Sequence, residues 1–307
     1  MAVSTWSPVS GNRGRRWFVD YQLELLAAAT GLVAETNTHF LTIFRTIAMV
    51  TSTSDTSTKS EPQTLRIYSA WDLTSRWFHW INALCVMGLI VFGLAILNAK
   101  VFGVSADGKI LLKTLHVYVG YVFAINLVWR LIWAFIGSAS ARWRAILPFR
   151  HGFLKSLRLY MSGIKANNTP LYLGHNPLGR LMVSLLFLLL VIQAATGLVL
   201  AGTDLYKPPF GGIIAEWVTN GDQDKLANLM PGSKENVDLV AYEQMREFRS
   251  PVIATHLYTF YILLGAVLLH IAGVVLADVR EKSGLISAMF TGQKVLSESP
   301  VDVHETQ

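Results

Sequence analysis

Four long stretches of apolar residues divide the chain, at 77–97, 110–136, 181–201 and 251–278, with polar or charged segments between them. An α-helix rises about 1.5 Å per residue, so about 20 apolar residues cross the roughly 30 Å hydrocarbon core of a bilayer. Each stretch meets that length. The pattern therefore predicts an all-α fold, an integral membrane four-helix bundle surrounded by membrane lipid.

The composition supports this class and narrows the chemistry. Charged residues make up 15% of the chain and hydrophobic residues 52%, whereas soluble domains carry about 25% charged residues. The net charge of +6 is modest, and in a membrane protein a basic excess marks cytoplasmic loops rather than a nucleic-acid partner. The single cysteine, Cys85, excludes an intrachain disulfide and a cysteine-based iron–sulfur or zinc site. Any redox chemistry would then need a bound cofactor.

The two ends of the chain do not share the pattern of the middle. The apolar segment near the N-terminus is interrupted by charge and too short to span, and a polar run typical of disorder follows it. We expect residues 1–65 to be an extension that is disordered or results from an over-called start, with Met49 as the biological start. The transmembrane domain is expected at 66–290 and a mobile tail at 291–307.

Loop charge predicts the orientation in the membrane. The segment 138–180 contains seven basic residues and no acidic one, and 152–164 has the pattern of an amphipathic helix lying on an anionic leaflet. By the positive-inside rule this loop is cytoplasmic. The loop 202–250 has eight acidic and five basic residues, which places it outside, and its length favours a docking surface. Both termini are then cytoplasmic.

Histidines occur within three of the four predicted spans. His256 and His270 are fourteen residues apart, which is close to four turns, so both leave one face of a helix about 21 Å apart along its axis. His79 lies at the start of the first span and His116 near the start of the second. With the N-terminus inside, the direction of each span puts His79 and His270 near the inner face and His116 and His256 near the outer face.

Two imidazoles from different helices at one depth can bind one iron ion from both sides. The pattern therefore predicts two haems, one held by His79 and His270 and the other by His116 and His256. Iron with two axial imidazoles has no open position, which favours outer-sphere electron transfer over oxygen binding. The alternative is that the histidines are hydrogen-bonded packing residues or, for His79, an interfacial anchor. The remaining histidines lie outside the spans and are not expected to be ligands: His39, His151, His175 and His304.

Arg130 lies deep in the second span, fourteen residues after His116, and shares its face. A buried guanidinium needs an anionic partner. We hypothesise that this partner is a propionate of the inner haem; the alternative is a helix-end cation that reaches back to the cytoplasmic interface. The third span, which has no histidine, is expected to close the bundle. Several glycines could leave room for a flat macrocycle or serve ordinary helix packing: Gly88, Gly93, Gly120, Gly197, Gly202 and Gly265.

Several motifs together resemble the bacterial cytochrome b561 and nickel-hydrogenase cytochrome b family over residues 66–290. They are RWFHW at 76–80, LHVYVGY at 115–121, the pair Arg130 and Trp133, LGHNPLGRLMV at 173–183, and the two histidines of the last span. The resemblance implies a four-helix membrane bundle with two haems b between bis-histidine pairs, the ligands being His79, His116, His256 and His270. It also implies an electron-transfer subunit, rather than a complete enzyme, that links the quinone pool to a redox partner in a respiratory chain.

The last span departs from the hydrogenase members of that family, which typically carry a histidine directly beside the outer ligand and a tryptophan further along. Here Leu257 stands beside His256, and the span contains no tryptophan. The resemblance therefore favours b-type cytochromes that accompany a periplasmic c-type cytochrome. Three alternatives stay open: the cytochrome b subunit of a nickel–iron hydrogenase, a stand-alone oxidoreductase passing electrons from superoxide or another small reductant to quinone, and a haem-free membrane anchor.

Overall fold

The computed structural model describes residues 65–149 and 152–302, and the fold below refers to these residues. They belong to one compact unit that begins at Gln63. The expectations for the N-terminal extension, including a start at Met49, lie outside the described residues. So do those for His39, His151 and His304.

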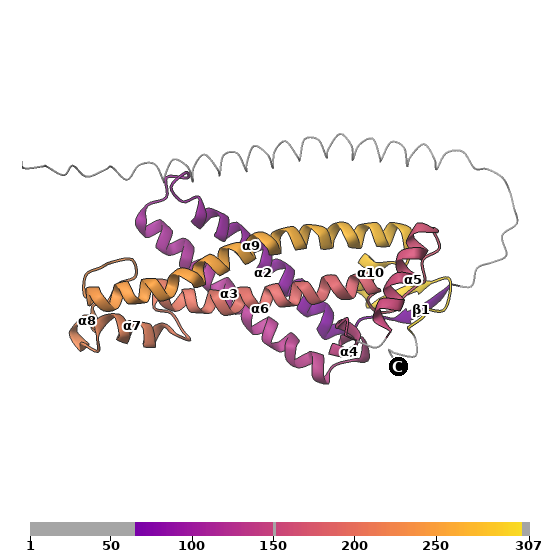
Figure 1. Cartoon of the computed structure of the whole chain (residues 1–307), viewed down its shortest axis with the longest axis horizontal. Coiled ribbons are helices and arrows are strands. Elements are labelled where there is room, and N and C mark those ends of the chain that lie inside the picture. Colours follow the sequence, from indigo (N-terminus) through magenta and orange to yellow (C-terminus); the bar gives the residue numbers. More distant parts are fainter. Residues whose placement is uncertain (1–64, 150–151, 303–307) are drawn as a thin grey trace, which may run out of the picture. The chain divides into compact units, whose positions relative to one another are not determined.

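Four long helices form the body of this unit: α2 (Leu73–Leu97), α3 (Ala106–Ile136), α6 (Pro177–Leu205) and α9 (Leu239–Glu281). Each is long and apolar enough to cross a membrane. Helix α2 packs against α3, α3 against α6, and α6 against α9 (Figure 1). The predicted all-α membrane bundle is therefore confirmed.

Each of the four helices has a polar residue at its N-cap, and the side chain of that residue accepts a hydrogen bond from a backbone N–H of the first turn. Such caps satisfy donors that the helix itself leaves open. Because the caps precede the apolar stretches, α2, α3 and α6 each begin about one turn earlier than hydrophobicity alone predicts. The capping residues are Asp72, Ser105, Asn176 and Asp238.

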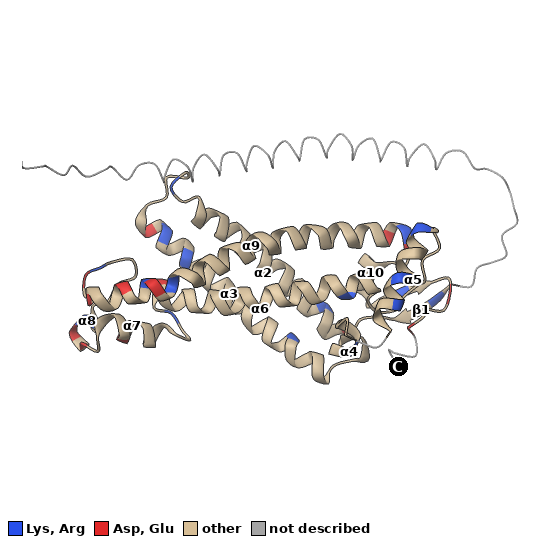
Figure 2. Cartoon of the chain, in the orientation of Figure 1, with Lys and Arg blue, Asp and Glu red and all other residues tan. Residues whose placement is uncertain are grey.

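The interior of the bundle is small and apolar, and all four helices contribute to it. Its buried residues are Cys85, Val86, Phe123, Leu127, Leu189, Leu190, Leu263 and Ala266. The outward faces are apolar as well, with exposed side chains such as Leu84, Ile125, Leu188 and Leu268. Lipid tails can cover such faces, whereas water cannot do so without cost. Charged residues gather toward the two ends of the bundle, and few occur along its middle (Figure 2).

One end, called here the α7 end, carries α7 (Gly211–Thr219) and α8 (Gln223–Ala227). Both helices lie in 202–250, which the sequence presents as a loop without evident structure. Helix α9 also begins in this segment, twelve residues before the predicted span, and it continues through Pro251 without a break. A second apolar cluster holds this end together. It consists of Ile214, Val218, Val237 and Met245.

The opposite end, called here the α5 end, carries the short elements. The predicted amphipathic segment forms α5 (Phe153–Lys165), and a two-stranded antiparallel sheet pairs β1 (Arg66–Ser69) with β2 (Gln293–Leu296). The 3-10 helix Ala139–Ala141 and the helices α4 (Trp143–Ile146) and α10 (Leu285–Thr291) complete it.

The strand β2 corrects the expectation of a mobile tail at 291–307, because residues 293–302 are anchored by two buried charged side chains. Lys294 is 1% exposed and donates from Nζ to the carbonyl oxygens of Tyr172 (3.0 Å) and Gly174 (3.3 Å). Asp302 accepts from the N–H groups of Leu173 (2.6 Å) and Gly174. Burial lowers the pKa of Lys294 to about 8, although Asp302 and nearby carboxylates oppose this shift.

Candidate functional site

At the α7 end the structure brings His116 of α3 and His256 of α9 together, as the sequence predicts. Their ring centroids are 6.4 Å apart and the ring planes make an angle of 75°. Two imidazoles that bind one metal ion from opposite sides, each through a nitrogen at about 2.0 Å, have centroids roughly 6 Å apart. The separation of this pair therefore fits a bis-imidazole metal centre.

Helix α6 contacts His256 at two points. The sequence analysis did not predict these contacts, because the third span, which forms α6, has no histidine. Thr196 Oγ1 lies 2.8 Å from His256 Nδ1, and Gln193 Nε2 donates to the backbone oxygen of His256 over 3.1 Å. Thr196 is followed by Gly197, where a Cβ atom would stand 3.4 Å from His256 Cε1. The backbone of α6 therefore lies close beside the ring. Polar residues inside an otherwise apolar span were the available signal.

His116 is approached in a similar way from α2. A Cβ atom at Gly93 would stand 3.7 Å from His116 Cε1. Two glycines therefore border the two imidazoles, Gly93 of α2 beside His116 and Gly197 of α6 beside His256. This arrangement suits a flat group, which is one of the two roles that the sequence leaves open for both glycines, the other being ordinary helix packing.

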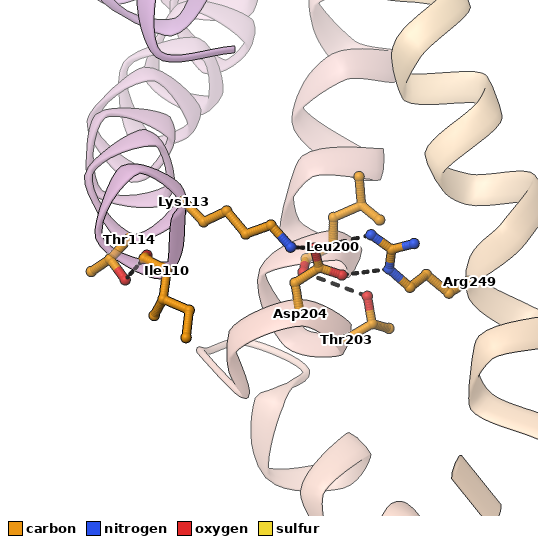
Figure 3. A network of polar contacts seen from close by, with 7 residues as sticks. All are labelled: Ile110, Lys113, Thr114, Leu200, Thr203, Asp204 and Arg249. Atoms are coloured by element: carbon orange, nitrogen blue, oxygen red, sulfur yellow. Dashed lines mark hydrogen bonds and ion pairs between the residues drawn. The ribbon is translucent and has the colours of Figure 1, made fainter. Parts of the chain in front are cut away.

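A network of ion pairs lies beyond the histidine pair at the α7 end (Figure 3). Asp204 of α6 accepts from Lys113 Nζ of α3 over 2.5 Å and pairs with the guanidinium of Arg249 of α9, whose second nitrogen lies at 3.0 Å. Lys113 precedes His116 by one turn, and Arg249 precedes His256 by two. One carboxylate thus joins the three helices that carry Thr196 and the two histidines.

At the α5 end, His79 of α2 and His270 of α9 come from different helices, as predicted, and lie close enough to interact electrostatically. Neither ring is exposed. The α5 end therefore offers a second pair of imidazole rings, about 21 Å from the first along α9, because His270 follows His256 by fourteen residues.

Arg130 of α3 is buried at the α5 end, with 5% of its surface exposed. Its guanidinium carbon lies 5.7 Å from the ring centroid of Phe78 and 5.4 Å from that of Phe187. One of its terminal nitrogens is buried and forms no hydrogen bond with any described residue. Asp72 influences it electrostatically, but that carboxylate already accepts from Ser75 and Ser138. Arg130 thus keeps a free donor in a nonpolar setting.

The structure also places His175 near this pair, although the sequence analysis set it aside. Its ring centroid lies 4.7 Å from that of Trp71, and its Nδ1 is buried without a hydrogen bond to any described residue. Burial, followed by the positive charges of Lys294, Arg130 and Arg180, lowers the pKa of His175 to about 3. His175 is therefore neutral near pH 7. Its position was hidden because a loop, not a span, carries it.

Comparison with known proteins gives the family to which the chain is similar. A family model described as prokaryotic cytochrome b561 matches residues 70–292. The chain is 26% identical over 251 residues to a probable Ni/Fe-hydrogenase B-type cytochrome subunit of Rhizobium leguminosarum bv. viciae, covering 78% of this chain and 92% of that protein. A relative of the same name from Azotobacter vinelandii is 26% identical over 260 residues, covering 81% and 97%. A third, the hydrogenase 1 subunit of Escherichia coli K12, is 29% identical over 135 residues, covering 41% and 56%.

Proposed function

The chain belongs to the prokaryotic cytochrome b561 family, and on that premise we propose that it carries two haems b and transfers electrons between the quinone pool and a redox partner. The membership makes it a membrane b-type cytochrome of electron transport. The observation that carries the proposal is the separation of 6.4 Å between the rings of His116 and His256. It supports a haem iron clamped between them.

Haem b bound at these positions supplies reversible one-electron chemistry at its iron. The chain would contribute the imidazole nitrogens, the apolar surroundings and the nearby charges. With His116 and His256 both binding the iron, no position would be left for a small molecule such as oxygen. His79 and His270 would hold the second haem at the α5 end. Two redox centres at different heights along the bundle suit electron transfer across the membrane.

Arg130 has the role of a partner for a haem propionate at the α5 end. Its burial supports this role over that of a cation reaching back to the membrane interface, since it is 5% exposed. Its unpaired donor is suited to a carboxylate, which forms strong, often bidentate hydrogen bonds with arginine.

Replacing Arg130 with leucine is expected to lower the midpoint potential of the α5-end haem while the haem is retained. A positive charge favours the reduced form, and a unit charge roughly 10 Å away is worth about 1–2 kcal/mol at the effective dielectric constant of proteins. A redox titration followed by visible absorbance measures the shift. Arg142→Leu is the control, because Arg142 is exposed at the same end and donates to Gly137 O. An unchanged potential in Arg130→Leu would dismiss the propionate contact.

The orientation follows from charge. Lysine and arginine predominate at the α5 end, whereas the α7 end carries both signs (Figure 2), so the α5 end faces the cytoplasm and the α7 end the outside of a bacterial inner membrane. Both termini are then cytoplasmic. The redox partner docks at the α7 end, where apolar side chains are exposed beside acidic ones. The exposed apolar residues include Ile213, Met230, Leu239, Val240 and Phe248.

The partner class that the relatives favour is a nickel–iron hydrogenase, since their names describe hydrogenase cytochrome subunits. A periplasmic c-type cytochrome is the second candidate, which the presence of Leu257 beside His256 supports. The two candidates share the haem sites and the docking surface, and differ in the source of electrons.

The test uses native membranes that contain the full-length protein. We expect added quinol to reduce the b-type absorbance bands and added quinone to oxidise them. Reduction by hydrogen gas would identify a hydrogenase partner, and co-purification of a c-type cytochrome without a hydrogen response would identify the second candidate. Reduction of the purified protein by superoxide alone, or bands that ignore quinone and quinol, would contradict the proposal.

A further inference from the structure

The contact between Thr196 and His256 connects a helix without histidine to the proposed α7-end haem. Thr196 Oγ1 lies 2.7 Å from the carbonyl oxygen of Ile192, one turn earlier on α6, and 2.8 Å from His256 Nδ1. A hydroxyl group has one proton to donate and two lone pairs to accept with. A carbonyl oxygen can only accept, so the Thr196 proton goes to the backbone of its own helix. The contact with His256 is then one in which the ring nitrogen donates.

This direction assigns the tautomer of His256. With the proton on Nδ1, the lone pair of the ring is on Nε2, and Nε2 is the nitrogen available to a metal ion. Histidines that bind metals commonly donate their other ring N–H to a fixed acceptor, which orients the ring and raises the basicity of the binding nitrogen. Thr196 has the geometry of such an acceptor.

Helix α6 contacts His256 at more than one point. Gln193, one turn before Thr196, donates to the backbone oxygen of His256, and Gly197 lies beside the ring edge. Helix α6 therefore contacts both the backbone and the ring of His256. The ring planes of His256 and His116 differ by 75°, and the hydrogen bond to Thr196 opposes rotation of the His256 ring.

We infer that Thr196 is a positioning residue that holds the His256 ring with Nε2 free for iron and thereby sets the potential and ligand-plane angle of the α7-end haem. The inference rests on the proposed function, since it concerns a haem at this site. A more basic imidazole stabilises ferric iron over ferrous iron, so the hydrogen bond lowers the midpoint potential of that haem. In low-spin ferric haem, the angle between the axial imidazole planes governs the anisotropy of the EPR signal.

The test compares three variants of the full-length protein with the wild type, by redox titration and by EPR of the oxidised haems. Thr196→Val keeps the shape of the side chain and removes the acceptor. We expect this variant to shift the reduction equilibrium of the α7-end haem about tenfold toward the reduced form, which raises its midpoint potential by about 59 mV for one electron. The EPR signal of the α7-end haem should change, whereas the potential and EPR signal of the α5-end haem should stay the same. Thr196→Ser should restore both properties.

Thr203→Val is the matched control, because Thr203 is a buried threonine of the same helix whose hydroxyl contacts Leu200 O. It should leave both haems unchanged. Loss of the α7-end haem in Thr196→Val, with retention in Thr196→Ser, would also support the role of the hydroxyl group. An unaltered potential and EPR signal in Thr196→Val, or an equal change in Thr203→Val, would overturn the inference. A wild-type protein without haem would instead refute the proposed function, so the two failures are distinguishable.

Discussion

Replacing His256 with alanine is expected to halve the haem content of the purified protein and to remove the α7-end haem. The reason is that His256 would supply one of the two iron ligands, and its partner His116, at 6.4 Å between ring centroids, would already supply the other. Replacing His270 should remove the α5-end haem instead. Haem per polypeptide, together with the spectrum and potential of the haem that remains, distinguishes these outcomes.

The pairing makes this prediction sharper. His116→Ala should leave the same haem as His256→Ala, and His79→Ala the same as His270→Ala. His175→Ala is the control for a buried histidine near a proposed site and should keep both haems. If His116→Ala and His270→Ala removed the same haem, the pairing would be wrong. If His256→Ala still contained two haems, His256 would not be a ligand.

Replacing Asp204 with asparagine is expected to cause a large loss of stability. The carboxylate forms ion pairs with both Lys113 and Arg249, and the side chains of Asp204, Arg249 and Lys113 are 13%, 18% and 29% exposed. Removing one partner of a buried pair leaves uncompensated charge and costs about 3–5 kcal/mol. We expect a loss of about 3 kcal/mol, at the lower end because some exposure remains. Thermal unfolding in detergent measures it as a lower midpoint temperature.

The control is an exposed ion pair at the same end of the bundle. Lys234 and Glu243 lie 3.2 Å apart, with side chains 59% and 58% exposed. Such pairs contribute about 0–1 kcal/mol, so Glu243→Gln should hardly change the unfolding temperature. Equal effects of Asp204→Asn and Glu243→Gln would show that the network does not join the helices.

The four spans were predictable because hydrophobicity over about 20 residues is a strong signal for crossing a bilayer. The proximity of His116 and His256 was predictable as well, since helical periodicity and the direction of each span place both at one depth. Helix α6 was different. Its contact with His256 through Thr196 depends on how the helix is rotated about its axis, and an almost uniformly apolar sequence does not reveal that rotation.

The ends of the bundle were harder to predict for a related reason. Lys294 and Asp302 look like solvated residues in a polar tail, and their burial follows from backbone groups of the segment 172–174 that they satisfy. Partners so far apart in sequence leave no local pattern. In the same way α7 and α8 are short, and the apolar cluster that stabilises this end forms only after α9 packs against α7.

The amount of haem b per polypeptide in the full-length wild-type protein, purified in detergent, decides whether the bundle holds two bis-histidine haems. A pyridine haemochrome assay, referred to protein concentration from amino-acid analysis, measures this ratio. Two pairs of imidazoles, His116 with His256 and His79 with His270, predict a ratio of two, with both haems low-spin in the oxidised state. A ratio of one or none, or a high-spin haem with an open axial position, would contradict the arrangement.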